Sequence, residues 1–216
     1  MAAFKSHISF GVLTAIALTF LLGYFSIISG FSLFIVFTLT VIGSMLPDID
    51  SDSGLPVRLL FLSISIALAT LSLFYIDSIY SVSLLEKGLI SIGCGLGTYF
   101  IAGNIFKYFT VHRGIFHSIP ASLVFGLAAL SLSSEFGFGD KESLSFGLAV
   151  SVGYLCHLLL DELNSTTNLA GGSFLPKKSL GTAMQLWAPS VVTSSLMYML
   201  LFILLFHNKN IIINSI

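Results

Sequence analysis

The sequence has few charged residues and few cysteines. Asp, Glu, Lys and Arg make up only 9% of its 216 residues, and the formal net charge is −1. So few charges cannot cover a soluble domain, and no basic face is present to neutralise nucleic-acid phosphates. Two cysteines, Cys94 and Cys156, both within apolar runs, exclude a disulfide framework or a cysteine-based zinc site. The chain also lacks GxSxG, HExxH and Walker A patterns.

Long apolar runs make up most of the chain instead, and 56% of its residues are hydrophobic. A helix needs about twenty mostly apolar residues to cross a bilayer, and seven segments approach that length. We therefore predict an all-α, multi-pass membrane bundle that forms one domain over residues 1–216. The predicted crossings are 8–28, 31–46, 59–76, 88–106, 119–133, 144–163 and 189–206.

Local signals support several of these boundaries. Pro47 is expected to end the second helix, because proline cannot continue it. Ser118 is suited to cap the fifth helix, with Pro120 in its first turn, where a missing N–H costs nothing. His117 then lies just outside that helix start. Residues 164–176, rich in Asn, Ser, Thr and Gly, are expected to form a loop.

Lys and Arg are distributed unevenly between the two sides of such a bundle. With seven crossings, six of them fall on the side of the N-terminus and three on the other. By the positive-inside rule, the first side faces the cytoplasm. The six are Lys5, Arg58, Lys107, Arg113, Lys177 and Lys178, and the three are Lys87, Lys141 and Lys209.

The same topology gathers histidines and aspartates at the cytoplasmic ends of the helices. His207 falls on the opposite side and is excluded. Polar groups between membrane-length segments need partners or water, so packing alone does not explain a group of this size. Its members are His7, Asp48, Asp50, His112, His117, His157 and Asp161.

These residue types and spacings favour a metal site. His157 and Asp161 are four residues apart, which places them on one helix face, whereas Cys156 is turned about 100° away. Asp48, Asp50 and Asp161 lie at predicted helix C-terminal ends, where the helix dipole disfavours negative charge and a cation would stabilise it. Nitrogen and oxygen ligands favour Zn²⁺, with Mn²⁺ or Fe as alternatives, and seven candidates could serve one metal or two.

Simpler interpretations exist for each residue taken singly. His7 alone is better explained as an interfacial polar group, and Asp48 to Asp52 could form a solvated turn. His157 and Asp161 could hydrogen-bond between helices. The metal prediction therefore depends on the joint pattern. Separately, Gly93 and Gly97 form a GxxxG pair, expected to pack within the chain or, alternatively, to make a homodimer.

Three motifs, in this order, resemble a known family. They are Leu46-Pro-Asp-Ile-Asp50-Ser51, His112-Arg-Gly-x-x-His117-Ser118 and Gly153-Tyr-x-x-His157-x-x-x-Asp161, preceded by His7. Together they are similar to the YdjM-type family of bacterial membrane proteins, for which metal-dependent hydrolysis has been inferred. The resemblance spans nearly the whole chain and implies a multi-pass protein of the bacterial inner membrane with a metal site made of His and Asp. The seven His and Asp residues match the family's polar positions. One departure is that the family's Leu-Trp-Pro-like element is represented here by Phe174-Leu175-Pro176.

The function expected from this reading is metal-assisted hydrolysis of a phosphoester in a lipid or lipid-linked substrate. Asp48 or Asp50 could act as general base, and Arg113 could hold the phosphate through its planar guanidinium. Two alternatives stay open at this point. One is a transporter or ion-binding membrane protein, and the other is a non-catalytic scaffold whose metal only ties helix ends together.

Overall fold

The computed structural model describes most of the chain as helices, and every element within the described residues is helical. Contacts divide the chain into two compact units, residues 1–47 with 113–216 and residues 48–112. The single membrane domain expected from the sequence stays a prediction. The described residues are 4–50, 58, 61–62, 65–66, 68–70, 72, 83–102, 104, 116–166, 184–187 and 190–215.

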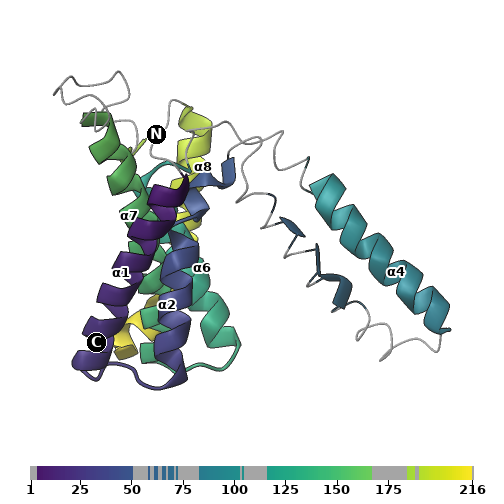
Figure 1. Ribbon diagram of the computed structural model, residues 1–216, viewed down its shortest axis with the longest axis horizontal. Coiled ribbons are helices and arrows are strands. Elements are labelled where there is room, and N and C mark those ends of the chain that lie inside the picture. The colour runs from purple at the N-terminus through teal and green to yellow at the C-terminus, as the bar shows by residue number, and fades with distance from the viewer. Residues whose placement is uncertain are drawn as a thin grey trace. The chain divides into compact units, whose positions relative to one another are not determined.

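The described part of the first unit contains five α-helices, which form a bundle. Figure 1 shows these helices packed side by side. A short 3-10 helix, η1, follows the second of them at Leu46–Asp50. Ser118 caps α6 by accepting a hydrogen bond from the backbone N–H of Ala121 at 3.2 Å, with proline in the first turn, as predicted. The five helices are α1 (Phe4–Tyr24), α2 (Phe31–Gly43), α6 (Ile119–Glu135), α7 (Asp140–Thr166) and α8 (Val191–Ser215).

Helix α7 is the centre of this bundle. It packs against α1, α2, α6 and α8. In the apolar, membrane-length part of α7, 67% is buried by the rest of the protein, compared with 17% in the corresponding part of α1 and 22% in that of α8. A helix surrounded by protein in this way can carry polar side chains that lipid would not tolerate. Two ligand candidates, His157 and Asp161, lie on this helix.

Glycines allow the neighbouring helices to approach α7 closely. A Cβ at Gly153 would collide with the carbonyl oxygen of Thr40 on α2, and one at Gly43 would lie 2.5 Å from the carbonyl oxygen of Val150. Small residues at helix interfaces are typical of membrane bundles, because packing must replace the missing hydrophobic driving force between helices. The end of α2 is therefore held directly against the middle of α7.

The second unit contains α4 (Leu84–Gly97), which continues into the π-helical turn η2 (Thr98–Ala102). The described residues between 58 and 72 are helical as well. Gly95 faces them, since a Cβ there would lie 3.2 Å from that of Ala69. At Gly93 and Gly97 a Cβ would meet no atom of the described chain within 4 Å. Homodimerisation through these two glycines stays a prediction.

The all-helical, multi-pass fold is confirmed. Five described helices are long and apolar enough to cross a membrane, and α6 is a shorter apolar helix. The count of seven stays a prediction, because the third predicted segment, 59–76, is described only in part. Of the 164–176 segment, predicted as a loop, residues 164–166 belong to α7 and the remainder lies outside the described residues.

The predicted end of the last helix at Phe206 is wrong, because α8 continues to Ser215. Asn208 is fully buried, and its side-chain amide donates to Ser131 Oγ at 2.7 Å and to the Leu127 carbonyl oxygen at 3.3 Å. The polar residues after Phe206 therefore include one that hydrogen-bonds to α6, and they do not end the helix.

Candidate metal centre

Helix α7 supplies two residues of the site one helical turn apart. His157 is 1% exposed and Asp161 is 3% exposed. The Nε2 atom of His157 lies 3.8 Å from Oδ2 of Asp161, which confirms that the spacing of four residues brings the two side chains together. Cys156 points elsewhere, since its Sγ lies 3.1 Å from the hydroxyl of Thr14.

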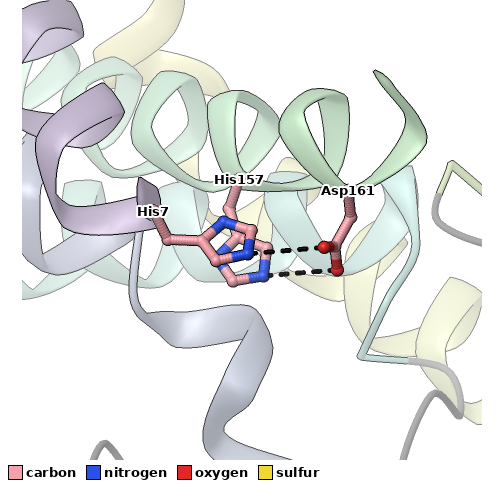
Figure 2. Close-up of side chains that lie close together, drawn as sticks. All are labelled: His7, His157 and Asp161. Atoms are coloured by element: carbon pink, nitrogen blue, oxygen red, sulfur yellow. Dashed lines mark ion pairs between the residues drawn. The ribbon is translucent and has the colours of Figure 1, made fainter. Parts of the chain in front are cut away.

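The third residue comes from the first turn of α1. His7 is 4% exposed, and its ring stacks on that of His157 with 3.8 Å between centroids and 14° between planes. Figure 2 shows the two stacked rings beside the Asp161 carboxylate, which the dashed lines join to both. His7 Nε2 lies 3.3 Å from Oδ1 of Asp161. The interfacial interpretation of His7 as an isolated polar group therefore does not describe its surroundings.

His117, the fourth residue, precedes α6 and lies on no helix, as the sequence predicted. It is 1% exposed, and its Nε2 atom lies 3.9 Å from Oδ2 of Asp161. Its ring meets that of His157 edge to face, with 6.0 Å between centroids. Three imidazole nitrogens from separate parts of the chain thus surround one buried carboxylate.

The spacing of these donor atoms suits a metal better than direct hydrogen bonds. The separations of Asp161 oxygens from His157 and His117 nitrogens, 3.8 and 3.9 Å, are too long for hydrogen bonds. For donors at about 2.0–2.1 Å from a tetrahedral zinc, neighbouring donor atoms lie about 3.3 Å apart. The contact between His7 and Asp161, at 3.3 Å, matches this value, and donor atoms of His7, His157 and Asp161 all lie within 4.8 Å of one another.

A main-chain contact determines which nitrogen of His157 faces the carboxylate with a lone pair. Its Nδ1 lies 2.7 Å from the carbonyl oxygen of Ser44, just after α2. A carbonyl oxygen only accepts, so Nδ1 carries the hydrogen and donates it. In the neutral ring Nε2 is then the unprotonated nitrogen, which is the form that binds a metal.

Two glycines bring Ser44 to this position. Gly11 on α1 is one turn after His7, and Gly153 on α7 is one turn before His157. A Cβ at Gly11 would collide with Ser44 Oγ, and one at Gly153 would lie 3.0 Å from Ser44 N. Each helix that carries a stacked histidine therefore has a glycine one turn away, and α2 ends in the space that these glycines leave.

Within the first unit, four of the seven predicted ligands lie together: His7, His117, His157 and Asp161. Asp48 lies on η1 in the second unit, and the backbone of Asp50 ends that 3-10 helix, while the side chain of Asp50 is outside the described part. His112 and Arg113 also lie outside the described residues. The roles assigned to these four residues stay predictions. His207, which the sequence excluded, is exposed on α8.

Sequence reasoning missed Tyr154 and Gln185, which hold the chain on both sides of His117. The Tyr154 hydroxyl donates to the carbonyl oxygen of Phe116, and the Ile119 N–H donates to the carbonyl oxygen of Gln185 at 3.0 Å. For Gln185 a signal was present, since Leu186-Trp187-Ala188-Pro189 follows it and matches a Leu-Trp-Pro-like element. This run is a better match than the 174–176 segment, which lies outside the described residues.

Fold and site together define a class of protein: a multi-pass helical membrane protein with a buried cluster of histidine and aspartate near helix ends. A family model, the YdjM inner membrane protein family, matches residues 1–213. The chain belongs to this family and is a multi-pass inner-membrane protein, in agreement with the resemblance seen in its motifs. Neither the curated proteins nor the solved structures that were compared with the chain gave a match.

Proposed function

We propose that this protein is a metal-dependent hydrolase of the inner membrane that cleaves a phosphoester in a lipid or lipid-linked substrate. The observation that carries the proposal is the arrangement around Asp161. Three histidine Nε2 atoms lie 3.3–3.9 Å from its two oxygens, in a site where all four side chains are almost fully buried.

The donor set fits a divalent metal, with Zn²⁺ first and Mn²⁺ or Fe as alternatives. His7, His157 and Asp161 form a three-ligand set, and two histidines with one carboxylate are a known ligand set of catalytic zinc sites. His117 adds a fourth ligand. When bound, such a metal supplies Lewis acidity, which lowers the pKa of water toward neutrality and polarises a phosphoryl oxygen.

The protein residues have separate tasks in this proposal. His157 is held by Ser44 in the tautomer that presents Nε2, and Asp161 supplies the negative charge that a divalent cation requires. Asp48 or Asp50 would take a proton from the attacking water, and Arg113 would hold the phosphate through two parallel hydrogen bonds. Access from the cytoplasm is supported by the excess of Lys and Arg predicted on that side.

Metal analysis of the purified protein in lipid nanodiscs tests the first half of the proposal. We expect wild-type protein to bind one or two divalent ions per chain, and His157→Ala and Asp161→Ala to lower that content. His207→Ala, an exposed histidine on α8, is the matched control and should bind as wild type does. A wild-type protein that binds no divalent metal would refute the proposal.

Hydrolysis assays test the second half. Water-soluble phosphoesters, phospholipids and lipid-linked phosphates are offered to the metal-loaded protein and to Asp161→Ala in parallel. We expect phosphate release from a lipid-borne substrate that depends on added metal and is lost in the variant. Activity that survives chelation or persists in Asp161→Ala would show that it does not come from this site.

A second candidate function, metal binding without catalysis, is favoured by one feature of the same geometry. Four protein donors complete a tetrahedral site and leave no position for water, as in structural zinc sites, whereas hydrolysis requires a further position that water occupies. The coordination number decides between the two functions. X-ray absorption spectra of the zinc-loaded protein that fit four protein ligands and no water would favour the structural role.

A further inference from the structure

Three of the four clustered ligands lie on helices, and His117 does not. His7 belongs to α1, and His157 and Asp161 belong to α7, so helix packing fixes their backbones. His117 is instead in the short segment before α6. The His117 backbone must therefore be held by contacts other than helical hydrogen bonds, and those contacts determine where its side chain lies relative to Asp161.

The contact on the N-terminal side of His117 comes from α7 itself. Tyr154 is fully buried, and its hydroxyl donates a hydrogen bond to the carbonyl oxygen of Phe116. That carbonyl belongs to the peptide bond joining Phe116 to His117. The bond therefore orients the peptide plane from which the His117 side chain projects.

Tyr154 is itself rigidly held. Its ring stacks on Phe125 of α6, with 5.6 Å between centroids, and it belongs to the buried cluster formed with Ala121 and Leu158. It lies three residues before His157, so it shares a helix face with that ligand and with Asp161. One face of α7 thus carries two ligand candidates and the side chain that holds the segment of a third.

We propose that Tyr154 is a positioning residue that sets the place of His117 relative to Asp161 through the Phe116 carbonyl oxygen. This inference rests on the proposed function insofar as His117 is treated as a metal ligand. Groups that orient a metal ligand typically change metal affinity by about 10–100-fold when they are removed. Tyr154→Phe removes only the hydroxyl and keeps the ring that packs on Phe125.

The first test measures zinc affinity by competition with a chelator in four proteins: wild type, Tyr154→Phe, His117→Ala and the double variant. We expect Tyr154→Phe to weaken binding by about 10–100-fold in the wild-type background and to have no effect when His117 is absent. Tyr24→Phe is the control, because Tyr24 is a largely exposed tyrosine at the other end of α1. Equal losses in both backgrounds would overturn the inference, because Tyr154 would then act through general packing.

The second test requires no metal and so separates this inference from the proposed function. Metal-free protein is treated with diethylpyrocarbonate, which modifies accessible imidazoles, and each histidine is followed by mass spectrometry. In Tyr154→Phe we expect His117 to be modified faster than in wild type and His7 to stay as protected as in wild type. The exposed His207 is the positive control and should be modified in both proteins. If His117 stays as protected as in wild type, or if His7 becomes reactive with it, Tyr154 does not position His117.

Discussion

Asp161→Asn offers the sharpest separation of metal binding from folding. The substitution keeps the size of a side chain that is 3% exposed and removes only its charge and one strong ligand atom. In wild type this carboxylate faces three imidazole nitrogens at 3.3–3.9 Å. Because a ligand should matter at least as much as the groups that orient it, we expect zinc affinity to fall by about 100-fold or more.

This loss of affinity converts into a change in stability that can be measured. Free zinc at about 1,000 times the wild-type Kd stabilises the folded state by about 4.1 kcal/mol. The same concentration is only about 10 times the Kd of a variant that binds about 100-fold more weakly, and it stabilises that variant by about 1.4 kcal/mol. The two proteins should therefore differ by about 2.7 kcal/mol in the stabilisation that zinc produces.

Trp187 makes the assay simple, because it is the only tryptophan of the chain. It stacks on Tyr198 of α8 and lies two residues after Gln185, whose carbonyl accepts from the start of α6. Its fluorescence during unfolding in mixed micelles, with and without zinc, gives the stabilisation for each protein. Asp140→Asn, at the opposite end of α7, is the control and should keep the wild-type gain. An equal gain in Asp161→Asn would refute the assignment of Asp161 as a ligand.

Three further predictions concern packing and topology. Gly153→Ala should cost about 1–3 kcal/mol of stability and weaken zinc binding, because the new Cβ collides with the Thr40 carbonyl oxygen. Gly93→Ala is the control and should not destabilise the protein, because no described atom lies within 4 Å of a Cβ at that position. A Gly153→Ala variant as stable as wild type would contradict the packing of α2 against α7. Asn208→Ala should cost about 1–2 kcal/mol by unfolding in mixed micelles, since two hydrogen bonds to α6 are lost, and the exposed Asn210→Ala should be neutral. Seven crossings place the termini on opposite sides, so a C-terminal alkaline phosphatase fusion should be active and an N-terminal fusion inactive; any other result contradicts the topology.

Much of the fold could be predicted from the sequence because lipid imposes a simple requirement on it. Apolar runs of membrane length indicate helices. When η2 is counted as part of α4, each described helix end lies within four residues of the predicted end, except the C-terminal end of α8. The end of α8 could not be predicted, because a polar residue near a helix end indicates solvent unless its partner is known. The partner of Asn208 is Ser131, which is 77 residues away in the chain.

The candidate site was partly predictable for a related reason. His157 and Asp161 could be paired by helical geometry alone, and membrane topology brought His7 and His117 to the same side. Topology assigns a side chain to a membrane face but not to a neighbour. It therefore could not show that His7 stacks on His157, a contact that depends on how α1 crosses α7.

The residues that orient the ligands left the weakest signals, because main-chain atoms are one partner in each of these contacts. His157 donates to the carbonyl oxygen of Ser44, and Tyr154 donates to that of Phe116. Any residue type could offer the same carbonyl, so neither Ser44 nor Phe116 is recognisable from its identity. What the sequence does show is the room made for these contacts, since glycine at position 153 lets α2 approach α7. In a buried polar site between helices, a glycine one turn from a histidine is therefore a useful indication that a carbonyl group orients the ring.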